Sequence, residues 1–234
     1  MTTSGLTTFN PDVNEYIEEA FERCGAELRS GYDFRTARRS LNLMFSDWAN
    51  RGINMWTIEQ GVQTLSQGTA TYTLPADTVD LIEHVIRTGA GNASTQADLQ
   101  ITRISVSTYS SIPNKLQQAR PIQVWINRQQ PAPQFTVWPV PDGSQTYQFV
   151  YWRLRRIQDA GSGSNTEDIP FRFINALVAG LAYYLSMKIP GAVERMPMLK
   201  QQYDEAWELA AQEDREKAAV RFVPRQQFIG SGTA

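Results

Sequence analysis

Few residues of the chain are of the types that perform chemistry, and they lie far apart. His84 is the only histidine and Cys24 the only cysteine. A zinc site at His84 would need carboxylates as its other ligands, because apolar spacing places Cys24 on the buried face of an expected helix. His84 falls in the apolar run 81–86, so we interpret it as a structural or surface histidine. We interpret Cys24 as a thiol packed in the core, and a single cysteine excludes an intramolecular disulfide.

The glycine- and serine-rich stretches do not match a catalytic or nucleotide-binding motif. The nucleophile elbow Gly-x-Ser-x-Gly does not occur. Gly161-Ser-Gly-Ser164 superficially resembles a phosphate loop, but it lacks the Lys-Ser/Thr terminus, and Pro170 separates it from the next helix. We predict a flexible surface loop there. The sequence therefore predicts no catalytic residue, no metal site and no cofactor.

Carboxylates form two groups, both at helical spacing. A hydrolytic pair would need one acid held in an apolar pocket, and these spacings are instead typical of solvated helix faces. If many copies formed a ring around DNA, such faces could line a channel that must not adhere to phosphate. The two groups are Glu15, Glu18, Glu19 and Glu22, and Glu205, Glu208, Glu213, Asp214 and Glu216.

Arginines also form two groups, which are the candidate contacts with other subunits or partners. Plain solvation and DNA contact are the alternatives for them. The formal net charge is −2, from 22 basic and 24 acidic side chains, so overall charge predicts no tight binding of nucleic acid. The groups are Arg35, Arg38 and Arg39, and Arg153, Arg155 and Arg156.

Amphipathic helices are expected at both ends of the chain. Asn10-Pro11 is typical of a helix start, and Asp33 is a candidate cap for a second helix, with a hairpin as the default arrangement of the two. Two more helices are expected, from Pro170 to about residue 189 and over about 198–219. We predict an α+β fold in which residues 11–53 and 170–219 form one antiparallel helical bundle. The apolar run 173–187 is too short to span a bilayer, and the chain is expected to be soluble when made.

The segment 54–160 between these helices is expected to form an inserted antiparallel β-subdomain. Its short runs alternate as strands do, a bulge or bend is expected at Gly61, and a short helix near Pro113. Pro141-Asp142-Gly143 is a strong turn signal. The interpretation is a meander of antiparallel strands, over 56–65, 69–74, 79–87, 101–106, 122–127, 135–138 and 147–154.

The last residues, 220–234, have no periodicity and are expected to form an extended C-terminal arm. Apolar side chains in such a segment indicate insertion into a neighbour's groove, or docking on the chain's own bundle. The candidate docking residues are Phe222, Val223, Arg225, Phe228 and Ile229.

The order and spacing of several stretches resemble a known protein family. Over about residues 15–218 the chain is similar to the head-to-tail adaptors of short-tailed phages, the tail tubular protein A or gatekeeper family. The stretches are Leu43-Met-Phe-Ser-Asp-Trp-Ala-Asn-Arg-Gly52, Gly68-Thr-Ala-Thr-Tyr-Thr-Leu-Pro75-Ala-Asp, Phe149-Val-Tyr-Trp-Arg153, Ile169-Pro170, Ala179-Gly-Leu-Ala-Tyr-Tyr-Leu185, and Tyr203 with residues 210–215.

The resemblance implies a virion protein without catalysis, made in the host cytoplasm and located at the neck of the particle. It implies a ring, usually twelve-fold, below the portal protein. The helices would face the portal, and the β-part would face nozzle or tubular proteins and possibly tail fibres. Double-stranded DNA would pass through without sequence-specific binding. The alternatives are a tail-associated cell-wall hydrolase, for which Asp77 and Asp80 are the residues to vary, and a nucleic-acid-binding regulator.

Overall fold

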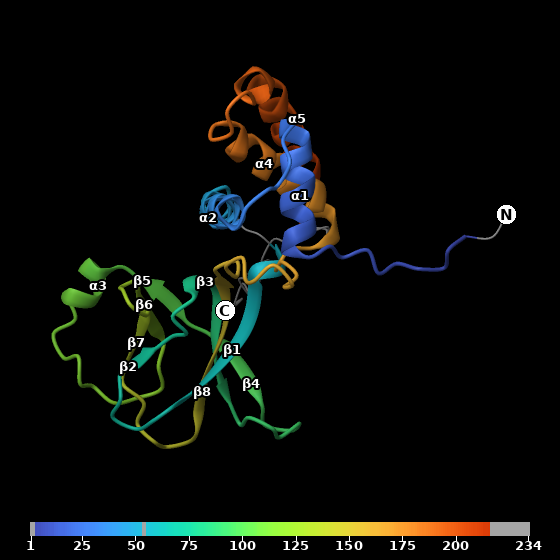
Figure 1. Cartoon of the computed structure of the whole chain (residues 1–234). Helices are drawn as coiled ribbons and strands as arrows, with labels where there is room; N and C mark the ends of the chain where they lie inside the picture. The colour runs from blue at the N-terminus through green and yellow to red at the C-terminus, as the bar shows by residue number, and fades with distance from the viewer. Residues whose placement is uncertain (1–2, 53–54, 216–234) are drawn as a thin grey trace, which may run out of the picture.

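A computed structural model of the chain describes residues 3–52 and 55–215. The described part is mixed α+β, with the long helices gathered at one end and two sheets at the other, where the short helix over residues 106–110 also lies (Figure 1). None of its helices is both long and apolar enough to cross a membrane. The helices are α1 (Val13–Cys24), α2 (Gly31–Trp48), α3 (Val106–Ser110), α4 (Ile174–Ser186) and α5 (Met196–Glu213). The strands are β1 (Ile58–Leu65), β2 (Thr71–Thr73), β3 (Thr78–Thr88), β4 (Ala97–Gln100), β5 (Thr102–Ile104), β6 (Gln123–Asn127), β7 (Gln134–Trp138) and β8 (Tyr147–Arg155).

Both N-terminal helices begin with a capping box, and in both the N-cap residue differs from the expected one. Asp12, rather than Asn10, caps α1, and the Glu15 side chain accepts from the Asp12 backbone in return. Ser30 caps α2, so Asp33 is not the cap but the third helical residue that completes the box. In each helix the carboxylate of the third residue, Glu15 or Asp33, accepts from the backbone N–H of the cap residue. This second hydrogen bond favours a later start than expected for α1 and an earlier cap for α2.

Helix α4 is the element that the other long helices share. It contacts α1, α2 and α5, whereas α1 and α2 contact each other little. The expected α1–α2 antiparallel hairpin is therefore wrong; α2 is seen nearly end-on in Figure 1, beside α1, which runs along the picture. Apolar residues line most of α4, so it is buried on several sides at once. The helices from both ends of the chain contribute to one buried cluster, as the predicted bundle requires, while the boundaries at 53, 54, 160 and 170 stay predictions.

Helix α5 ends at Glu213, six residues before the expected end at 219. The reason is Asp214, which turns inward instead of continuing a solvated face. Its carboxylate accepts from the Arg172 guanidinium and, at 2.9 Å, from the backbone N–H of Met55. This acid belongs to the interior, so its expected place on an exposed acidic face is a correction.

The strands pair in a different order from a simple meander. One sheet has the order β1-β8-β3-β4 and the other β2-β7-β6-β5. Strand β8 is antiparallel to both β1 and β3, while β5 is parallel to β6. Phe135 of β7 stacks on Phe149 of β8 with 4.2 Å between ring centroids, which joins the two sheets in a second buried cluster. Alternation along a strand indicates which face is buried but not which strand lies beside it.

The structure contradicts two local expectations in this part, the bulge that was one of the two alternatives at Gly61 and the helix start near Pro113. Strand β1 pairs with β8 in continuous register without a bulge at Gly61; a Cβ there would collide with the Tyr151 ring, so close approach of the ring explains the glycine. The register shifts lie instead between β3 and β8. The expected strand 101–106 is only β5 and is followed by helix α3, capped by Ser105, which ends before Pro113 instead of starting near it.

Candidate functional site

Two neighbouring arginines of β8 form an ion-pair network at the end of the sheet next to the helices. Arg153 and Arg155 are two residues apart and therefore lie on the same face of the strand. Both bind Glu59 of β1, at 2.8 Å from Arg153 Nη2 and 2.6 Å from Arg155 Nε. Arg153 also donates to Asp77, with 3.2 Å from Nη2 to Oδ2. Arg155 forms a bidentate pair with Asp168, just before α4, with 3.0 Å from Nη2 to Oδ1.

This network assigns Arg153 and Arg155 to contacts within the chain. Their side chains are only 12% and 11% exposed. The hydrogen bond from Arg153 holds the pKa of Asp77 below its usual value, and the bond to Asp168 raises the pKa of Arg155. The indole N–H of Trp56 also donates to the backbone oxygen of Asp168 at 3.0 Å. Segments from β1, β8 and the start of α4 are thus held together where the sheet meets the helices.

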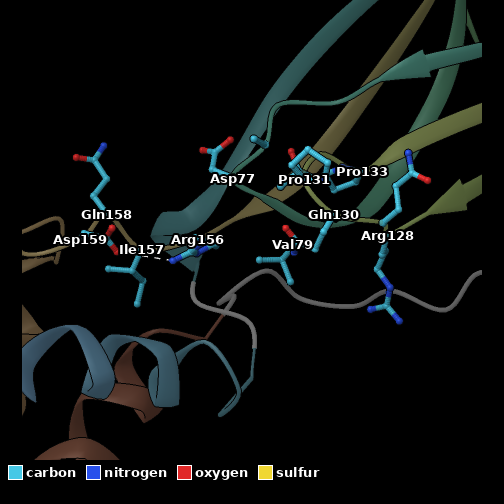
Figure 2. A pocket seen from close by; sticks show the side chains of 13 residues that line it. Asp77, Val79, Arg128, Gln130, Pro131, Pro133, Arg156, Ile157, Gln158 and Asp159 are labelled. Carbon is cyan, nitrogen blue, oxygen red and sulfur yellow. Dashed lines mark ion pairs between the residues drawn. The ribbon is translucent and has the colours of Figure 1, made fainter. Parts of the chain in front are cut away.

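Arg156, the third arginine of this group, is exposed and lines a cleft (Figure 2). The cleft has a volume of about 570 Å³ and lies between the segments 76–79, 128–133 and 156–159. Arg156 is 3.7 Å from Asp159, and Arg128 on the opposite side is 3.5 Å from Asp80. Such long, exposed pairs contribute little to stability, so both guanidinium groups remain available to a partner.

The arginines of α2 are less engaged within the chain. Arg35 and Arg39 are exposed, and Arg38 Nη1 donates to the backbone oxygen of Gly161 at 3.3 Å. Arg39 lines a surface hollow of about 660 Å³ together with Lys188. Burial and the nearby Arg39 charge lower the pKa of Lys188, whose ammonium donates to the Ser40 hydroxyl at 2.7 Å. The contact of these arginines with other subunits stays a prediction.

A long groove runs along the face formed by α1, α4 and α5. It consists of hollows of about 570 and 440 Å³ that share Arg23 and Asn175 as lining residues. Large apolar side chains stand exposed at its edges, Phe171 at 74% and Leu209 at 69%. The sequence alone does not predict this groove. Phe171, directly after Pro170, could have pointed to it, because a large apolar residue at the start of a helix is usually buried by a neighbouring surface.

Two buried polar groups without a hydrogen-bond partner lie near this face. The Tyr16 hydroxyl and Oε1 of Glu167 have none among the described atoms. Burial, and then the charge of Asp168, raises the pKa of Glu167 to about 7, and burial followed by the Glu167 charge raises the pKa of Tyr16 to about 12. Glu167 was not singled out in the sequence, since two adjacent acids in a polar loop, Glu167 and Asp168, carry no signal that one of them is buried.

The residues considered for catalysis or metal binding are buried in the core or paired with other side chains of the chain. His84 is buried in β3 near Phe149, and burial lowers its pKa. Cys24 is buried and donates to the Ala182 oxygen at 3.2 Å, as a core thiol should. Asp77 and Asp80 are both bound by arginines. In the part of the chain that the structure describes, no group of three or more His, Cys, Asp or Glu side chains could hold a metal ion.

The remaining predicted sites are the acidic helix faces and the C-terminal arm. Glu18, Glu22, Glu205 and Glu208 are exposed, and Glu19 pairs with Arg23 at 2.9 Å. Glu216 and the docking residues Phe222, Val223, Arg225, Phe228 and Ile229 lie outside the described residues.

Comparison with known proteins gives the chain a family. A family model described as SU10 adaptor protein matches residues 12–225, which is most of the chain. A search of curated proteins found no match. The matched range contains the helices of both ends and both sheets, and it agrees with the resemblance to phage head-to-tail adaptors. The chain belongs to the SU10 adaptor protein family, and it is a phage adaptor that contacts other head and tail components at the neck of the virion.

Proposed function

We propose that copies of this chain form a ring below the portal protein of a phage, continue the DNA channel, and carry the platform to which nozzle or tubular tail proteins attach. The family match over residues 12–225 carries this proposal. The chain performs no reaction in this role. Its function is to bind a head component on one side and a tail component on the other.

The division of the molecule into a helical end and a sheet end supports two separate binding faces (Figure 1). The helices face the portal and the sheets face the tail. The network of Arg153 and Arg155 with Glu59 and Asp168 keeps the two ends in a fixed relation, as a connector between two partners requires. Exposed Arg35, Arg39 and Arg156 supply contacts between subunits or with partners.

The exposed acids support a channel role. Glu18 and Glu22 on α1, and Glu208 on α5, present negative charge to solvent. Such charge repels the phosphate backbone, so double-stranded DNA passes without adhering. We further propose that the C-terminal arm, residues 220–234, reaches onto the portal. The family match ends within this arm, at residue 225.

The experiment is reconstitution of the chain with the portal protein of its own phage, followed by cryo-electron microscopy. We expect a closed ring on the portal, about twelve-fold, whose assembly relies on many individually weak contacts. Deletion of residues 230–234 should have a mild effect, while truncation before Phe222 should weaken portal docking and leave the thermal unfolding midpoint unchanged. A chain that binds neither portal nor tail proteins would contradict the proposed function; full docking after the longer truncation would remove only the arm.

A further inference from the structure

The residues before α1 form an extended arm that leaves the body of the molecule. Residues 3–10 are exposed throughout and lead away from the helices (Figure 1). Within the described residues, the one hydrogen bond of this arm is its own, from the Leu6 backbone N–H to the Ser4 hydroxyl at 3.4 Å. Leu6 is 74% and Phe9 69% exposed. Two large apolar side chains on an otherwise uncharged arm indicate a surface that is covered in the assembled state.

The groove between α1, α4 and α5 has the properties needed to receive such an arm. Its floor is apolar and buried, with Tyr16, Val178 and Ala179 among the lining residues. Phe171 and Leu209 at its edges are large, apolar and exposed, as are Leu6 and Phe9 of the arm, so contact between the two pairs would remove apolar surface from water. An extended segment of eight residues spans about 26 Å, at about 3.3 Å per residue. Helix α1, with 12 residues, is about 18 Å long, so the arm is long enough to follow the groove.

Charge also fits. The arm residues 3–10 carry no ionisable side chain. Charged groups at the groove are in ion pairs or already accept hydrogen bonds: Glu19 pairs with Arg23 at 2.9 Å, Arg172 pairs with Asp214, Glu15 accepts from the Asp12 backbone N–H, and Glu205 accepts from the Gln201 amide at 2.8 Å. An uncharged arm therefore brings no additional unpaired charge into the groove, where burying one would be costly.

The arm of the same chain is badly placed to fill this groove. Phe9 and Pro11 stand at the groove's mouth, but the arm continues away from the helices (Figure 1). To lie in its own groove the chain would have to reverse at Asn10-Pro11. The proline ring fixes its own φ, and the residue before a proline favours extended backbone, which opposes a reversal.

We infer that residues 3–10 of one copy lie in the α1–α4–α5 groove of the next copy, with Leu6 and Phe9 against Phe171 and Leu209. Arm and groove are different surfaces of one chain, so the contact between copies is heterologous. Such a contact, repeated from copy to copy, generates a ring when the rotation between neighbours closes. This inference rests on the ring of the proposed function and names the contact that holds neighbouring copies together.

Mixed cysteine variants test whether the contact is between chains. Full-length Leu6→Cys is mixed with full-length Leu209→Cys and oxidised mildly; buried Cys24, 3% exposed, does not compete. We expect covalent dimers of one chain of each kind. The matched control replaces Leu209→Cys by Leu116→Cys, because Leu116 is 81% exposed and lies outside the groove. A disulfide that forms only within a chain carrying both Leu6→Cys and Leu209→Cys, at every concentration, would overturn the inference.

A peptide titration tests the groove itself, whether or not rings form in solution. A fluorescent peptide of residues 3–11 is added to the full chain with Leu6→Ser, which weakens competition by the chain's own arm and keeps Phe9, a lining residue of the groove, in place. We expect saturable binding that Phe171→Ser weakens by about tenfold or more and Leu116→Ser leaves unchanged. No saturable binding, or binding indifferent to Phe171→Ser, would overturn the inference.

The arm contact and the ring on the portal can fail separately. If rings form on the portal but the peptide does not bind, the arm contact is wrong and the proposed function stands. If the peptide binds the groove but no ring forms on the portal, the proposed ring below the portal is wrong. The groove then remains a binding site for the arm.

Discussion

The Trp48 indole Nε1–H donates a 2.8 Å hydrogen bond to the hydroxyl of Tyr203, 155 residues further along the chain. Both side chains are buried, and the bond joins α2 to α5 in the core shared by the helices of the two ends. Burial raises the pKa of Tyr203 to about 12, so the hydroxyl stays neutral over the physiological range. This polar contact links the C-terminal helix α5 to the N-terminal helix α2 inside the core.

Tyr203→Phe should therefore lower the free energy of unfolding by about 1–3 kcal/mol, because the Trp48 N–H loses its partner inside the core. Urea denaturation followed by tryptophan fluorescence measures the change. Tyr32→Phe is the matched control, since Tyr32 is 69% exposed and should change stability by less than about 0.5 kcal/mol. Equal effects of the two substitutions would contradict the role of the bond.

Gly180→Ala should destabilise the chain although alanine is the better helix former. A Cβ at Gly180 in α4 would lie 2.5 Å from Met44 Sδ and 2.7 Å from Tyr203 Cε2, so these buried side chains must shift; we expect a loss of about 1–3 kcal/mol in unfolding free energy. At Gly31, the first residue of α2, an added Cβ would meet no atom within 4 Å, and Gly31→Ala should be neutral or stabilising by up to about 1 kcal/mol. Calorimetry should show a lowered unfolding midpoint for Gly180→Ala and an unchanged or raised one for Gly31→Ala.

Arg155→Ala and Arg156→Ala distinguish a structural arginine from its exposed neighbour. Removing Arg155 leaves Asp168, whose side chain is only 19% exposed, without its bidentate partner, and we expect a loss of about 2 kcal/mol in unfolding free energy. Arg156 is 66% exposed and its ion pair is long, so its replacement should change stability by less than about 0.5 kcal/mol. Chemical denaturation of both variants at pH 7 makes the comparison. A larger loss for Arg156→Ala would contradict the assignment of Arg155 as the structural partner.

Glu167 should make the chain less stable as pH rises towards neutrality. Its pKa is raised from 4.5 to about 7 in the folded chain, so between these values the folded state keeps a proton that the unfolded state releases. Its contribution is fully present below about pH 4.5 and is lost as pH rises through about 7, by up to about 3 kcal/mol. The uncharged Glu167→Gln should remove this loss.

The measurement is the difference in unfolding free energy between Glu167→Gln and the unchanged chain, at several pH values. We expect the variant to gain relative stability from pH 5 to pH 8, because other titrating groups cancel in the difference. Glu18→Gln, on the exposed face of α1, is the control and should give a flat difference. A flat difference for Glu167→Gln as well would show that the carboxyl is not buried in its protonated form.

Local spacing in the sequence was enough to predict most of the elements and the family. The four- and seven-residue spacing of Ala37, Leu41 and Trp48 in α2 puts them on one helix face, and all three are buried; alternation predicted most strands. The predicted adaptor family was confirmed by the family match. These predictions succeed because helix and strand periodicities, and the motifs of a family, are properties of neighbouring residues.

Pairing between distant segments was decided only by the tertiary structure. Arg153, Arg155 and Arg156 are alike in sequence, yet two bind acids of other segments and one faces solvent, because Glu59 and Asp168 approach from β1 and from the turn before α4. The same holds for β8 between β1 and β3, and for the groove whose walls come from both ends of the chain. Sequence spacing sets the direction in which each side chain leaves its own backbone. Which groups the side chain then contacts depends on how elements remote in sequence pack together, and the free energy of those contacts cannot be read from neighbouring residues.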